Sequence, residues 1–253
     1  MRTSTPAQGF INGSGRPGFA GTCNFCHANG GANVKAATVG APKDENRNFN
    51  TNIEAKVHPA RCCNPNPDPN FPKDGGFGRT DNGDGTFGNR TFNTASVVEA
   101  ADTAPFFHNN VVRTLKEAVA FYSGPEFLAL PPVVPKFDFT DDENELIADF
   151  LRGINTLQNI DVAKRELQEI LDNKNDPLGE QDKRLQTAFE ETQDAIEVLT
   201  GQDVFQLALP DLNAARADIS QALLNTNPSQ RRQIVQQAID SLTAARGQVG
   251  TGG

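Results

Sequence analysis

The feature that most constrains this chain is a C-x-x-C-H motif, "CNFCH", at residues 23–27. Two thiols at this spacing can form thioether bonds to both vinyl groups of a haem, and the adjacent histidine can then bind the iron. The alternative is a redox C-x-x-C with an unrelated histidine, but that motif needs a strand–helix context, which the glycine-rich flanks do not provide. The motif therefore predicts one covalently attached haem c, with Cys23 and Cys26 as attachment points and His27 as an iron ligand.

The first 105 residues show no regular periodicity and are rich in Gly, Pro, Asn and Asp, which is typical of loops. Loops of this length are uncommon in a compact domain unless something else supplies apolar surface, and a buried haem would do so. Apolar spacing then predicts a helix over 114–122, ended by Gly124 and Pro125. A second helix is expected from Thr140, because Thr140 and Glu143 match the capping box and the first turn is acidic.

From residue 158 onward the chain reads as a helical extension. Short connections favour antiparallel neighbours, so we expect a small bundle. Its amphipathic segments are expected at roughly 160–173, 180–200, 211–225 and 229–246. Two apolar stripes mark its core, one of Leu185, Phe189, Ile196 and Leu199, and one of Ile234, Val235, Ala238, Ile239 and Leu242. The predicted fold is mostly α, with a cytochrome c type haem domain with long loops at 1–157 and the extension at 158–253.

Charge and hydropathy limit the partners of the chain. The net charge is −9, and the extension alone has 9 basic and 15 acidic residues, so we expect no nucleic acid partner. No apolar run approaches the ~20 residues that cross a membrane. The N-terminus lacks a secretory signal pattern. Since haem is attached to cysteine on the exported side of the bacterial membrane, we expect a periplasmic or otherwise exported protein. Either a signal was removed or this chain is part of a longer product, and we favour the second.

The sixth iron ligand has few candidates. Met1 is the only methionine, and a free terminus is a poor ligand, so the high potential of a His–Met haem is not expected. The remaining donors are His58, His108 and Tyr122. A phenolate would favour ferric iron and give a low potential, and it would require loss of a proton with an ordinary pKa of about 10. Tyr122 could equally be an ordinary half-buried aromatic residue.

Residues 91–122, "TFNTASVVEAADTAPFFHNNVVRTLKEAVAFY", resemble a family signature. It is that of the bacterial di-haem cytochrome c peroxidase and MauG family, approximately F-x-T-P-x-L-R-N-V-A-x-T-A-P-Y-F-H-D-G-x-x-x-T-L-E-E-A-V-x-F-Y. The resemblance extends upstream through "GFINGSG" and "CNFCH" and downstream through "FTDDENELIADFL", about residues 6 to 156. It implies the second, electron-transfer haem domain of a two-domain protein whose peroxide-reacting haem lies on a preceding domain that this chain lacks.

The resemblance also implies site residues. It places the distal ligand at Tyr122, since the family has methionine there in the peroxidases and tyrosine in the MauG type. His108 matches the histidine of the haem pocket, which could bind iron, bond a propionate or position water. Where the family has Pro and Arg in T-P-x-L-R-N, this chain has Ala95 and Val98, followed by Glu99.

In the family, that arginine commonly forms an ion pair with a haem propionate. Without it, the propionate charge would have to be neutralised by Arg90, Arg113 or solvent. Glu99 would be unfavourable there unless it points away.

Two further features stand apart from the motif. Cys62 and Cys63 are adjacent, and the open alternatives are a vicinal disulfide, free thiols, or a metal site with His58 and a carboxylate such as Asp68. The spacing matches no zinc signature, so we favour a structural loop stiffened by the prolines that follow.

The second feature is "RTDNGDGTFG" at 79–88, which does not fit a calcium loop and reads as turns.

Three functions remain in competition. The first is an electron-transfer module with a six-coordinate haem. The second is a peroxidase or MauG-like oxidoreductase that acts with a second haem domain absent from this chain. This function would need an iron with an open sixth position and His108 nearby as general acid and base. The third is a docking role, with oligomers formed through the extension. A redox partner protein is expected in every case.

Overall fold

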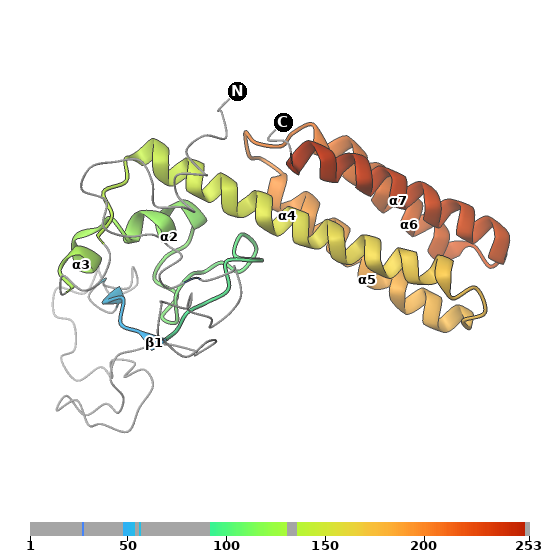
Figure 1. The fold of residues 1–253 in the computed structure, drawn as a ribbon, viewed down its shortest axis with the longest axis horizontal. Helices are drawn as coiled ribbons and strands as arrows, with labels where there is room; N and C mark the ends of the chain where they lie inside the picture. The colour runs from blue at the N-terminus through green and yellow to red at the C-terminus, as the bar shows by residue number, and fades with distance from the viewer. Residues whose placement is uncertain (1–26, 28–47, 54–55, 57–91, 131–135, 251–253) are drawn as a thin grey trace, which may run out of the picture. The chain divides into compact units, whose positions relative to one another are not determined.

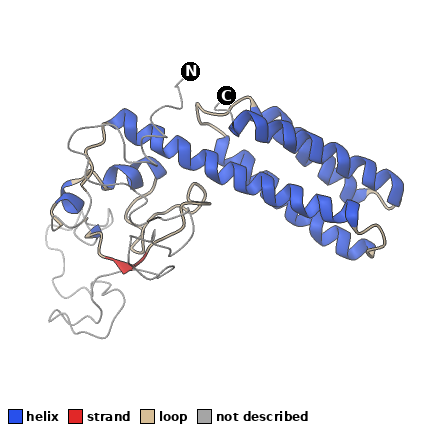
Figure 2. Cartoon of the chain, in the orientation of Figure 1, coloured by secondary structure: helices blue, strands red, loops and turns tan. Residues whose placement is uncertain are grey.

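The computed structural model describes residues 27, 48–53, 56, 92–130 and 136–250, and these are mostly helical (Figures 1 and 2). The mostly α class is thereby confirmed. The chain forms two compact units, Met1–Phe150 and Leu151–Gly253. None of the described helices is long and apolar enough to cross a membrane.

The first unit has short elements around a phenylalanine-rich core. The strands β1 (Asn48–Phe49) and β2 (Phe92–Asn93) pair antiparallel, and they are followed by α2 (Leu115–Phe121) and α3 (Pro125–Leu128). The buried core residues are Ile53, Val111, Val112, Ala118, Phe121, Phe127 and Phe137. Chain segments that have little regular structure are therefore held by apolar side chains that come from several distant places in the sequence.

Helix α2 starts where the sequence predicts it. Thr114 is the N-cap, its hydroxyl accepts a hydrogen bond from the backbone of Glu117, and the Glu117 carboxylate accepts from the backbone of Thr114. This reciprocal pair satisfies two backbone donors that the first helical turn leaves without partners. The helix ends at Phe121 with Tyr122 as its C-cap, and Pro125 begins α3 rather than only ending α2.

Helix α4 (Asp141–Asp172) confirms one prediction and contradicts another. Its start has the expected capping box, with the backbone nitrogen of Thr140 donating to Glu143 Oε2 at 2.8 Å and that of Glu143 to Thr140 Oγ1 at 3.3 Å. The separate segments expected on either side of residue 158 are instead one 32-residue helix. Between them the chain has neither proline nor glycine, so nothing interrupts the backbone hydrogen bonds. The predicted boundary at 157/158 thus lies inside α4.

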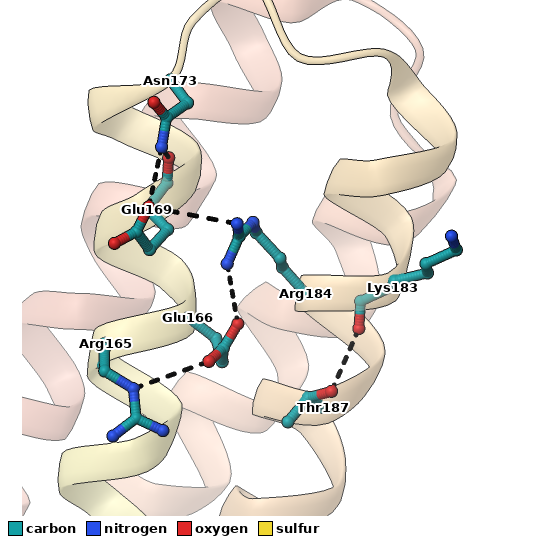
Figure 3. A network of polar contacts seen from close by, with 7 residues as sticks. All are labelled: Arg165, Glu166, Glu169, Asn173, Lys183, Arg184 and Thr187. Carbon is teal, nitrogen blue, oxygen red and sulfur yellow. Dashed lines mark hydrogen bonds and ion pairs between the residues drawn. The ribbon is translucent and has the colours of Figure 1, made fainter.

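The second unit is a bundle of the C-terminal part of α4 with α5 (Leu178–Leu199), α6 (Ala208–Leu224) and α7 (Pro228–Gly250) (Figure 1). Figure 3 shows the α4–α5 contact, where Arg184 Nη1 lies 3.0 Å from Glu166 Oε2. Arg216 on α6 donates to Gln193 on α5, and Gln248 on α7 to Asp211 on α6.

The predicted stripes form the interior of this bundle. Leu185, Ile196 and Leu199 are buried, and every member of the second stripe, from Ile234 to Leu242, is buried as well. Phe189 is only half-buried. Alternating burial at helical spacing is what the sequence periodicity predicts, because a helix in water must cover its apolar face against neighbours.

Candidate haem-binding site

His27 is the one residue of the C-x-x-C-H motif that the structure describes. Its Nδ1 lies 2.9 Å from the backbone oxygen of Ala95. An imidazole whose Nδ1–H is donated to a carbonyl keeps the lone pair of Nε2 for another partner, and this is the usual arrangement of a metal-binding histidine. The hydrogen bond orients Nδ1 of the ring toward the segment that follows β2.

The protonation of His27 agrees with that geometry. Burial lowers the pKa of His27 below its ordinary value, and the hydrogen bond to Ala95 offsets this only in part. The neutral imidazole is therefore favoured near neutral pH. Only a neutral imidazole can bind iron, because the protonated ring has no lone pair to give.

The segment that follows β2 carries the departures from the family signature. Ala95 contributes its carbonyl to His27, a role that needs no particular side chain. Val98 donates its backbone N–H to the Ser96 hydroxyl in a tight turn. Glu99 is exposed, with a φ of 63°.

His108 lies in a sharply turned loop. Phe106 and Val112 pair across the base of this loop, where the Phe106 backbone nitrogen donates to the Val112 oxygen at 2.7 Å. Phe107 and Asn110 have φ values of 64° and 54°. Asparagine tolerates this left-handed region, whereas a bulky residue such as phenylalanine is strained there by of order 1–2 kcal/mol. Such strain in a non-glycine residue is common at functional sites.

The ring of His108 packs nearly parallel to a neighbouring aromatic ring. It stacks on Phe92 of β2, with ring centroids 3.5 Å apart and planes inclined by 10°. In the same loop, Asn109 Oδ1 is buried and has no hydrogen-bond partner among the residues that the structure describes. A buried acceptor of this kind calls for a donor from outside the chain's own described residues.

Tyr122 packs in an aromatic cluster. Its ring centroid lies 5.0 Å from that of Phe127 and 5.6 Å from that of Phe121, both edge-on, and 6.2 Å from that of Phe107. Phe107 is adjacent to His108 in the chain, so the loop and the end of α2 meet. The side chain is half-buried, which suits both the ligand and the packing interpretation.

Several predicted residues lie outside the described part of the chain: Cys23, Cys26, His58, Cys62, Cys63 and Arg90, together with the turns at 79–88. Arg113 is described and exposed, and its backbone nitrogen donates to Glu117. Of the five predicted cofactor-binding residues the structure describes three, each with its own neighbour: His27 bonds to Ala95, His108 stacks on Phe92, and Tyr122 packs against Phe107.

The described residues include two kinds of group that a haem c site uses, a histidine oriented through Nδ1 and a phenylalanine-rich apolar core. Comparisons with family models, with curated proteins and with solved structures find no match for the chain. The case for a haem site thus depends on this chain's own residues.

Proposed function

We propose that the chain binds one haem c and serves as an electron-transfer protein. Cys23 and Cys26 are the covalent attachment points, and His27 is the proximal ligand. The observation that carries the proposal is the His27 Nδ1 hydrogen bond to Ala95, at 2.9 Å, next to the C-x-x-C-H motif. When bound, the haem supplies a one-electron ferric/ferrous couple.

Tyr122 is the sixth ligand in this proposal. The resemblance to the di-haem peroxidase and MauG family supports it, as does the absence of any methionine other than Met1. The half-buried ring at the end of α2 is held by phenylalanines, and this reduces the cost of orienting the phenol. An anionic ligand gives a low potential, so the partner protein is expected to work at low potential too.

Haem attachment is tested by producing the chain in a bacterial periplasm with the haem attachment machinery. Haem should stay with the polypeptide on a denaturing gel and give the visible spectrum of a thioether-linked haem. The variant Cys23→Ser with Cys26→Ser should lose this haem. The matched control is Cys62→Ser with Cys63→Ser, which removes the same number of thiols and should retain it. Equal loss in both variants would contradict the assignment.

The iron ligand is tested by the visible and electron paramagnetic resonance spectra of the ferric protein. A low-spin signal that becomes high-spin in Tyr122→Phe would support ligation by Tyr122. A high-spin signal in both proteins would mean an open iron face. That result would favour the peroxidase-type alternative, in which His108, held flat on Phe92, acts as acid and base.

Under that alternative, the chain reduces hydrogen peroxide or oxidises a partner together with a second haem domain. The isolated chain should then consume hydrogen peroxide, and His108→Gln should slow the consumption about 100-fold or more. A docking role of the bundle is checked by the mass of the full chain in solution, where a monomer would count against assembly through residues 158–253.

A further inference from the structure

Residues at or next to both ends of α2 are bonded to the start of α4 or to the segment just before it. At the C-terminal end, the backbone nitrogen of Phe139 donates to Ser123 Oγ at 3.0 Å. Near the N-terminal end, Lys116 Nζ lies 2.8 Å from Asp141 Oδ2 and 3.2 Å from Glu145 Oε2. Since Ser123 directly follows Tyr122, the first of these bonds fixes the backbone beside the proposed ligand.

The same segment also provides a wall for the Tyr122 ring. Phe137 is buried and meets that ring edge-on, with centroids 6.3 Å apart. Phe137 in turn stacks on Phe139 at 5.2 Å. Phe139 thus both donates the hydrogen bond to Ser123 and stacks on Phe137, which contacts the Tyr122 ring. The backbone beside Tyr122 and the ring of Tyr122 are therefore positioned together.

The two attachments differ in strength. The side chain of Lys116 is 32% exposed and that of Asp141 is 82% exposed, so water and salt weaken their ion pair. The Ser123 bond is half-buried and satisfies a backbone N–H outside any helix, which would otherwise need another acceptor. The Ser123 hydroxyl is therefore the attachment that matters more.

We propose that Ser123 is the positioning residue for Tyr122, and that its hydroxyl sets how readily Tyr122 gives up the sixth position to an outside anion. This inference rests on the proposed ligation by Tyr122. An anion can bind only when Tyr122 is displaced, so its apparent affinity is its intrinsic affinity multiplied by the displaced fraction. In this proposal the Phe139–Ser123 bond breaks when Tyr122 is displaced, so a variant that lacks the bond should have a displaced fraction about fivefold higher.

The test is an azide titration of the ferric haem-loaded chain, followed by the visible spectrum. Ser123→Ala should bind azide about fivefold more tightly than the unaltered protein, whereas Ser123→Thr keeps the hydroxyl and should restore the original affinity. Thr187→Ala is the matched control, because the Thr187 hydroxyl donates to the Lys183 oxygen within α5 at 3.2 Å (Figure 3). This control should leave the affinity unchanged.

A double variant separates positioning from general stability. In a Tyr122→Phe background no ligand remains to be displaced, so adding Ser123→Ala should change azide affinity by less than about twofold. A fivefold effect that persists in this background would overturn the proposal. If Tyr122→Phe raises azide affinity and Ser123→Ala does not, the positioning role of Ser123 is wrong, whereas ligation by Tyr122 is supported. If Tyr122→Phe has no effect on the spectrum, the ligation itself is wrong.

Discussion

Substitution of Arg231, on the first turn of α7, tests how much a buried charged side chain contributes to the stability of the bundle. Its side chain is 2% exposed, and its Nη2 lies 2.7 Å from Asp182 Oδ1 on α5. Its Nε donates to the Asn225 oxygen at 2.8 Å, and Nη2 makes a weak contact with the Leu223 oxygen at 3.5 Å. One guanidinium group thus bonds α5 and the α6–α7 connection. We consider the substitution Arg231→Met.

The magnitude follows from the partners of the guanidinium group. Loss of the hydrogen bond to Asn225 costs about 1 kcal/mol, and loss of the charge-assisted bond to Asp182 costs about 1.5 kcal/mol. Asp182 is 47% exposed and can regain water, which keeps the cost below the ~3–5 kcal/mol of breaking a fully buried pair. Among the described residues Arg231 Nη1 is buried without a hydrogen-bond partner, and methionine removes that penalty of about 0.5 kcal/mol. The net loss should be about 2 kcal/mol.

Urea unfolding followed by the helical circular dichroism signal measures this loss. For a unit of about 100 residues, 2 kcal/mol corresponds to a fall in Tm of about 10 °C. Arg246→Met is the matched control, because Arg246 is also on α7 and pairs with an aspartate, but it is 46% exposed. An exposed pair is worth at most about 1 kcal/mol. Equal losses for the two variants would refute the argument that burial decides the energy.

Three further outcomes are expected in the same unfolding assay. Gly153→Ala should destabilise by about 1 kcal/mol, because a Cβ would lie 3.1 Å from the Phe205 ring and overpacking outweighs the gain in helix propensity. Thr114→Ala should cost about 1 kcal/mol through loss of the N-cap, whereas equal stability would exclude the capping role. The hydrogen bond from Arg246 lowers the pKa of Asp161. Asp161→Asn should therefore cost about 0.5 kcal/mol at neutral pH, and the difference should vanish as the pH falls well below about 4.

The local elements could be predicted because their signals are local. The capping boxes at Thr114 and Thr140 and the stripe from Ile234 to Leu242 depend on residues three or four positions apart, which a helix brings together without help from distant segments. The continuity of α4 could also be predicted, since residues 154–172 contain neither proline nor glycine. The prediction of two segments there was wrong because a change in composition was taken for a structural boundary.

The bond between His27 and Ala95 joins residues 68 positions apart. Every residue offers a backbone oxygen, so the identity of Ala95 carries no signal for this contact. Ser123 was missed for a related reason, because its hydroxyl accepts from a backbone nitrogen 16 residues away. Neither partner is marked by its own side chain.

The sequence alone therefore determined the haem-attachment motif, the helical faces and the helix starts, because each depends on neighbouring residues. Only the tertiary structure decided which carbonyl orients His27, which ring supports His108, and that Arg231 is buried among three chain segments. An arginine three residues into a helix usually faces water. Its burial here depends on where α5 and the α6–α7 connection meet, and that is settled by packing across the bundle.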